Sequence, residues 1–180
     1  MRLYTILLLL LLSTTQHVHG QLILWSAERP LTWSDFQGNK PHKARARLAA
    51  TTSSFILYRA TRRRDSIITV VSAMFNTERS WKWRNDPGPY ILRHEQSHFD
   101  IAELYARKLR MQIAAYRQQH TGDELSQKQL RHLYRSNNVS LKHYQHLYDR
   151  RTKHSRRPEQ QERWNTDIAR QLEALRAYEN

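Results

Sequence analysis

A sharp break at residues 85–89 divides this chain into two parts of different structural character. These residues are Asn-Asp-Pro-Gly-Pro, and two prolines around a glycine cannot continue a helix or a central strand. The chain before the break is rich in β-branched residues, whereas apolar residues recur at helical spacing after it. The sequence therefore predicts an α+β fold, with a small N-terminal antiparallel β-sheet followed by three helices.

The expected sheet is built around one hairpin. Residues 45–59 are rich in Thr, Ser, Ile and Tyr, and residues 66–75 are mostly β-branched and apolar. Both compositions are typical of strands. The polar residues 62–65 lie between the two segments and supply a turn.

The expected helices span residues 90–120, 123–147 and 158–178. Gly122 would end the first helix and Asp123 would cap the second. The second segment is so polar that part of it could instead be a loop or an exposed hairpin arm. The third begins at Pro158, which suits a first helical turn, and four of its apolar residues recur at helical spacing and should belong to the core: Trp164, Ile168, Leu172 and Leu175.

Residues 1–20 have the pattern of an export signal. Arg2 precedes an apolar run over residues 6–12, and small residues lie before a cut ahead of Gln21. A retained anchor is the alternative, but the run is shorter than the roughly 20 residues that cross a bilayer. We therefore expect a signal peptide at 1–20 and one metallopeptidase-like domain at 21–180, exported to the periplasm or secreted, with no membrane-spanning segment after cleavage.

The composition restricts both ligands and partners. The chain has no cysteine, so any bound metal must be held by His, Asp or Glu. Its net charge of +14 suits an anionic envelope surface, such as lipid head groups or acidic polymers. A specific nucleic-acid partner is not expected, because no aromatic residues are grouped among the basic ones and no recognition motif is present.

The pentapeptide HEQSH at residues 94–98 indicates a metal site. On a helix, His94 and His98 lie one turn apart on the same face, where two imidazoles can bind one Zn²⁺. Glu95 lies at the rim of that site and could take a proton from a zinc-activated water, as a general base and acid. By chance the pattern would occur in about 3% of chains of this composition, so its place on an amphipathic helix is the stronger argument.

A third zinc ligand must come from elsewhere in the chain. Asp100 and Glu103 are rotated away from His98 on a continuous helix. Residues 148–154 are expected between two helices, and they offer His154 as the first choice of ligand and Asp149 as the alternative.

Tyr148 has two interpretations. Its phenol could donate a hydrogen bond to the oxyanion formed during hydrolysis, which would make it a second catalytic residue beside Glu95. It could also serve in packing, as buried tyrosines usually do. The neighbouring His143 and His146 are not expected to take part.

Several motifs together cover nearly all of the chain after the signal: 31–38 (LTWSDFQG), Ser80 with Trp81, 94–101 (HEQSHFDI), 148–154 (YDRRTKH), and Gln161 with Trp164. In these motifs the chain resembles an uncharacterised bacterial domain-of-unknown-function family described as secreted zinc-dependent proteases. The resemblance implies a compact zincin-like domain with His94 and His98 as ligands and Glu95 as catalytic acid/base. One departure is Ser155, where the family tends to have glycine after the last histidine.

Two functions of different classes follow. The first is an exported zinc metallohydrolase, a peptidase that could hold its peptide or protein substrate by strand addition to the strand ending near Phe75. The second is a cationic envelope protein that binds acidic polymers or lipid head groups, with a structural metal or none.

Overall fold

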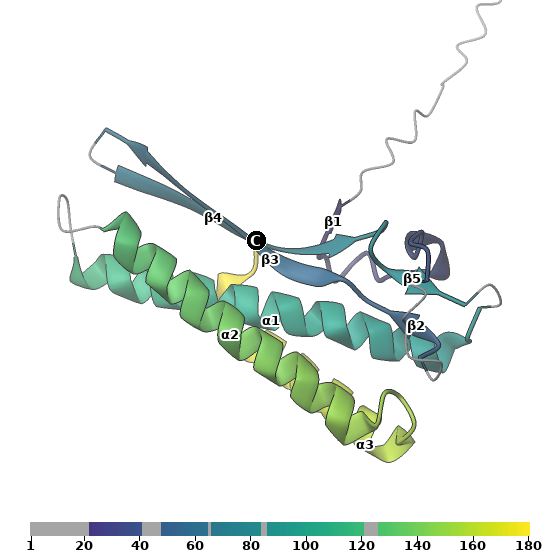
Figure 1. The fold of residues 1–180 in the computed structure, drawn as a ribbon. Coiled ribbons are helices and arrows are strands. Elements are labelled where there is room, and N and C mark those ends of the chain that lie inside the picture. Colours follow the sequence, from purple (N-terminus) through teal and green to yellow (C-terminus); the bar gives the residue numbers. More distant parts are fainter. Residues whose placement is uncertain (1–21, 41–47, 65, 84–85, 121–125) are drawn as a thin grey trace, which may run out of the picture.

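The computed structural model describes residues 22–40, 48–64, 66–83, 86–120 and 126–180 (Figure 1). The expected signal peptide and the expected helix boundary at Gly122 and Asp123 lie outside these residues. Among the described residues, no helix is both long enough and apolar enough to cross a membrane. The architecture is α+β, with a small antiparallel sheet followed by three helices, as the sequence predicts.

The sheet has three strands in the order β1-β4-β3. They are β1 (Leu22–Leu24), β3 (Ser54–Arg63) and β4 (Ser66–Asn76), and each pair is antiparallel. Strands β3 and β4 form the expected hairpin, with Arg63 opposite Ser66 at its end. The segment expected as one strand over residues 45–59 is instead divided: β2 (Ala50–Thr51) pairs with β5 (Trp81–Lys82) in a separate ribbon, and β3 starts three residues later.

The position of β4 corrects one expectation. Near Phe75 this strand pairs with β1 on one side and with β3 on the other. Ile23 of β1 and Ser54 of β3 both lie opposite Phe75. Both edges are therefore occupied by the chain itself, and a peptide substrate cannot add to β4 at this point.

The three helices are α1 (Pro89–Gln119), α2 (Gln127–Thr152) and α3 (Pro158–Ala174), followed by a short 3₁₀ turn η3 (Arg176–Tyr178). Helix α2 is continuous despite its polarity, because Leu130, Leu141 and Tyr148 are buried along one face. It also extends five residues past its expected end. Residues 148–152 thus belong to a helix and not to a loop, which corrects the expectation for the segment that holds Asp149.

Helix α1 lies at the centre of the fold. It packs against the sheet on one side and against α2 and α3 on the other (Figure 1). Phe75 of β4 contacts Phe99 of α1 in the core, with ring centroids 5.7 Å apart. This burial on two sides holds the HEQSH segment inside the molecule, between the end of the sheet and the two later helices.

Candidate metal centre

The HEQSH segment lies in the second turn of α1 and just after it. The helix starts at Pro89 after Gly88, whose φ of 93° lies in the left-handed region that favours glycine. His94 is buried and His98 is nearly so, and their rings are 5.0 Å apart between centroids. The two imidazoles therefore come together as their spacing predicts.

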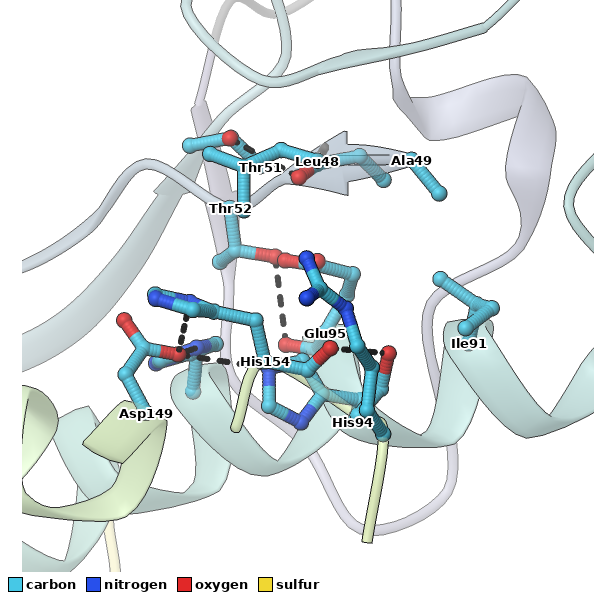
Figure 2. A pocket seen from close by; sticks show the side chains of 13 residues that line it. Leu48, Ala49, Thr51, Thr52, Ile91, His94, Glu95, Asp149 and His154 are labelled. Atoms are coloured by element: carbon cyan, nitrogen blue, oxygen red, sulfur yellow. Dashed lines mark hydrogen bonds and ion pairs between the residues drawn. The ribbon is translucent and has the colours of Figure 1, made fainter. Parts of the chain in front are cut away.

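Asp149 of α2 completes a group of three potential ligands. Its Oδ1 lies 3.3 Å from Nε2 of His94 and 3.1 Å from Nε2 of His98. One ligand atom from each residue lies within 4.8 Å of the other two. Two donors bound tetrahedrally to zinc at about 2.0 Å are about 3.3 Å apart, so the distances to Asp149 match those of a zinc site. Figure 2 shows Asp149 and His94 facing the same space from different helices.

His154, the first choice for the third ligand, lies outside this group. Its Nδ1 is 3.3 Å from Oδ1 of Asp149, and its side chain is 36% exposed. The geometry thus favours the alternative, Asp149. The reason is that α2 continues through residue 149 and turns the carboxylate toward α1, whereas His154 follows the end of the helix.

His154 lies in a left-handed turn that forms part of the pocket wall. Lys153, His154 and Ser155 have φ values of 50°, 51° and 64°, an arrangement that is unfavourable for residues with a side chain. The turn is closed by hydrogen bonds from the His154 amide to the Asp149 carbonyl and from the Arg157 amide to the Thr152 carbonyl, both 2.9 Å. Ser155 thus adopts a conformation that glycine would adopt without strain.

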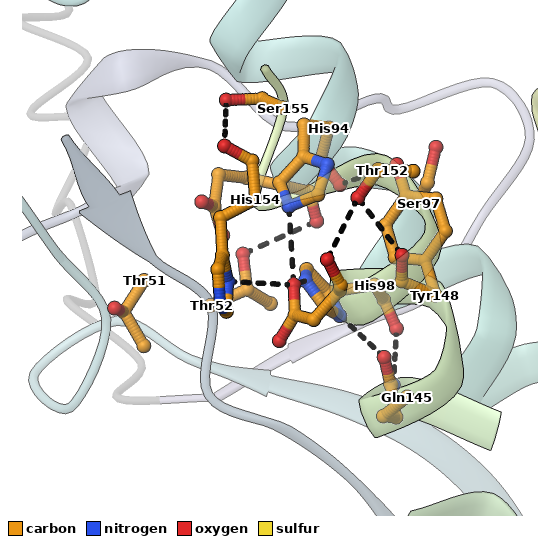
Figure 3. A network of polar contacts seen from close by, with 12 residues as sticks. Thr51, Thr52, His94, Ser97, His98, Gln145, Tyr148, Thr152, His154 and Ser155 are labelled. Carbon is orange, nitrogen blue, oxygen red and sulfur yellow. Dashed lines mark hydrogen bonds and ion pairs between the residues drawn. The ribbon is translucent and has the colours of Figure 1, made fainter. Parts of the chain in front are cut away.

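Two glutamines orient the two histidines. Oε1 of Gln161, at the start of α3, is 3.2 Å from Nδ1 of His94. Oε1 of Gln145, in α2, is hydrogen-bonded to Nδ1 of His98 (Figure 3). Gln145 also donates to the carbonyl of His98 at 2.8 Å. An amide oxygen accepts a hydrogen bond only from a protonated Nδ1, so in the neutral ring Nε2, which is directed at Asp149, is the nitrogen left to bind a metal.

Removing one of these acceptors should weaken metal binding. We expect Gln161→Met, which keeps the length of the side chain but not its acceptor, to lower zinc affinity by about 10- to 100-fold. Gln161→Glu retains an acceptor and is the matched control, expected to bind zinc more tightly than the methionine variant does. Competition with a chromogenic chelator measures both. Equal affinities for the two variants would contradict the orienting role.

Tyr148 lies behind the histidines and not in the pocket. It is fully buried, its ring stacks on His94 at 4.7 Å and meets His98 edge-on at 5.0 Å. Its hydroxyl is 3.5 Å from the backbone carbonyl of His94, and burial raises the pKa of Tyr148. The suggested hydrogen bond to a substrate oxyanion does not fit this position, whereas the packing interpretation does.

Glu95 faces a pocket of about 310 Å³ together with the three potential ligands. The residue is buried, and its Oε2 has no hydrogen-bond partner among the described residues. A buried, unpaired carboxylate oxygen is costly and is often found where a ligand or substrate completes the site. The opposite wall is formed by residues 48–52, in and around β2, and Thr52 ties this wall to α1 by donating to the Glu95 carbonyl at 3.1 Å.

Asp149 alters the protonation of His98. Burial on its own lowers the pKa of His98, but the hydrogen bond and the charge of Asp149, with the charge of Glu95, outweigh burial and raise it to about 9. The pKa of Asp149 is held well below its usual range: burial opposes this, but the hydrogen bonds from both histidines prevail. The site therefore attracts positive charge, which a metal cation can supply in place of the proton.

Zinc binding should accordingly release a proton. His98 has a raised pKa, so it is protonated at neutral pH, while zinc needs its neutral form. We expect about one proton to be released per zinc at neutral pH, and zinc affinity to rise with pH until about 9. Calorimetric titration with zinc in buffers of different ionisation enthalpy measures this release. A titration without proton release would show that His98 is already neutral.

Other acids and histidines near the motif lie outside the site. Asp100 accepts hydrogen bonds from Trp25 and Gln96, and Glu103 pairs with Arg107, so these two acids stabilise the fold as their rotation on the helix predicts. His143 and His146 are exposed on α2.

Sequence reasoning missed the orienting role of the glutamines and the pocket wall at residues 48–52. Gln145 precedes Asp149 by four residues, so a helical assignment for residues 148–152 would have placed both on one face. Gln161 offers no comparable local signal, since it meets His94 from 67 residues away.

Comparisons with protein-family models, with curated proteins and with solved structures return no match to this chain.

Proposed function

We propose that this protein is an exported zinc-dependent hydrolase that cleaves peptide bonds. The observation that supports this most directly is the presence of His94, His98 and Asp149 in one pocket with the unpartnered carboxylate of Glu95. The HEQSH segment lies on a helix beside a β-ribbon, and this arrangement supports a zincin-like architecture, which we include in the proposal.

The residues present fit zinc better than other common cations. Two imidazole nitrogens and one carboxylate oxygen form a usual ligand set for catalytic zinc, which retains an open position, whereas Mg²⁺ and Ca²⁺ prefer oxygen ligands. The glutamines behind both histidines add the outer hydrogen bonds typical of such sites. Bound there, zinc would lower the pKa of a water molecule toward 7 and polarise a carbonyl group.

Glu95 has the role of proton carrier in this proposal. Its free Oε2 accepts a proton from the attacking water and then donates it to the amine that leaves. The strand β2 is a candidate for holding the substrate, because it pairs only with β5 among the described residues and its residues line the pocket. An extended peptide could add to its other edge, with main-chain hydrogen bonds that do not depend on sequence.

Metal removal tests the proposal. We expect the protein, purified after export and loaded with zinc, to cleave members of a broad peptide library. Chelation should abolish cleavage, and added zinc should restore it, because in this mechanism the nucleophile is a water molecule that zinc activates. Mass spectrometry of the products measures the cleavage. Activity that persists after verified zinc removal would rule out the proposed mechanism.

A further inference from the structure

One end of the molecule is basic. It contains the outer half of the β3–β4 hairpin, the last turns of α1 and the first turns of α2, which lie together in Figure 1. No acidic residue occurs among the described residues of 48–76 or of 104–148. Three acids, Asp65, Asp123 and Glu124, fall in the segments that the structure does not describe. They are outnumbered by seven cations at this end: Arg59, Arg62, Arg63, Arg64, Arg117, Lys128 and Arg131.

The charges of the helices lie close to the hairpin. Arg117 of α1 donates to the Ile67 carbonyl and to Thr69 of β4, at 2.6 Å and 3.0 Å. Burial raises the pKa of Tyr58 in β3, and the nearby charges of Arg131 and Arg117 oppose that rise. The four hairpin arginines are exposed, and none of them forms an ion pair within the described part of the chain. Arg117 and Arg131 therefore add their charges to those of the hairpin arginines.

Aliphatic side chains are exposed within this basic region. The register pairs Arg59 with Val70 and Thr61 with Ile68, and cross-strand partners share a face. Ile68 and Val70 are 48% and 46% exposed, and they lie on the face opposite Ile67 and Val71, which are buried beneath the helices. We name this outer face of Arg59, Thr61, Arg63, Ile68 and Val70 the hairpin face.

We propose that the hairpin face docks on the surface of a bilayer that contains anionic lipids. Arginine side chains bind lipid phosphates, while the two aliphatic side chains enter the boundary between head groups and acyl chains. An acidic polymer would use the arginines but leave Ile68 and Val70 in water. A second copy would bring two basic regions together, which is electrostatically unfavourable.

Docking is separate from the candidate metal centre. The pocket residues come from the first turns of α1, the end of α2 and the segment around β2, and none of them belongs to the hairpin face. A variant of the hairpin face should therefore bind lipid less well and zinc equally well, and failure of one proposal leaves the other intact.

Vesicle sedimentation tests the docking. The protein is purified after export, with its mass showing that the leader has been removed, and is mixed with vesicles of phosphatidylcholine with or without phosphatidylglycerol. We expect binding only to the anionic vesicles. Arg59→Gln/Arg63→Gln should lower the partition coefficient by about 10- to 30-fold. The matched control Lys142→Gln/Arg163→Gln removes two exposed charges from α2 and α3 and should change it by less than about 3-fold.

The aliphatic pair has its own variant and control. Ile68→Thr/Val70→Thr keeps β-branched side chains and should lower the partition coefficient by about 10-fold or more. The control is Val139→Thr, at a 69% exposed position of α2, which should leave the partition coefficient nearly unchanged. Binding that depends on the arginines but not on the aliphatic pair would show a purely electrostatic attraction, which any acidic polymer could satisfy, and would overturn the proposal. Equal loss in the target and control variants would also overturn it.

Discussion

Replacing Glu95 by glutamine is expected to reduce peptide hydrolysis by about 10²- to 10⁴-fold while zinc binding persists. Glutamine has nearly the size of glutamate but cannot accept a proton from water. The carboxylate lies in the pocket and does not belong to the group of three potential ligands that converge there. Its removal should therefore affect proton transfer and leave the ligand set intact.

Steady-state rates and zinc stoichiometry, measured on the same preparation, test this expectation. Glu162→Gln makes the same chemical change at an exposed position of α3 and should leave the rate nearly unchanged. A Glu95→Gln protein that hydrolyses peptides at the rate of the parent would show that Glu95 is not the proton acceptor. Loss of zinc together with activity would instead place Glu95 among the ligands.

Exchanging Asp149 for alanine should lower zinc affinity by more than about 100-fold, well beyond the effect of losing an orienting hydrogen bond. Its Oδ1 lies 3.3 Å from Nε2 of His94 and 3.1 Å from Nε2 of His98. Its carboxylate also supplies the negative charge that favours a cation over neutral solvent in this pocket. His154→Ala should reduce zinc affinity much less, because His154 lies outside the converging group.

The comparison of these two variants decides which of the two candidates, Asp149 or His154, is the third zinc ligand. Chelator competition measures both affinities, and thermal unfolding without zinc shows whether each variant remains folded. A larger loss of zinc affinity in His154→Ala than in Asp149→Ala would reverse the assignment. That outcome would require the left-handed turn at residues 153–155 to move toward the histidines.

The sequence predicted elements whose signal is local. The break before Pro89, the hairpin of β3 and β4 and the start of α3 at Pro158 agree with the structure to within a few residues at most boundaries. The pairing of His94 with His98 was also predictable, because a helix places residues four apart on one face whatever surrounds it. The polar sequence of α2 gave a weaker signal, and its last turn was expected as loop.

What the sequence alone determined about this protein is thus the order of strands and helices and the two histidines with their neighbouring glutamate. Only the tertiary structure decided that Asp149 and not His154 joins them, that Gln145 and Gln161 orient their rings, and that β4 has no free edge near Phe75. The physical reason is distance along the chain: Asp149 meets His98 across 51 residues, and such contacts depend on how whole helices pack, which no local pattern of residues records.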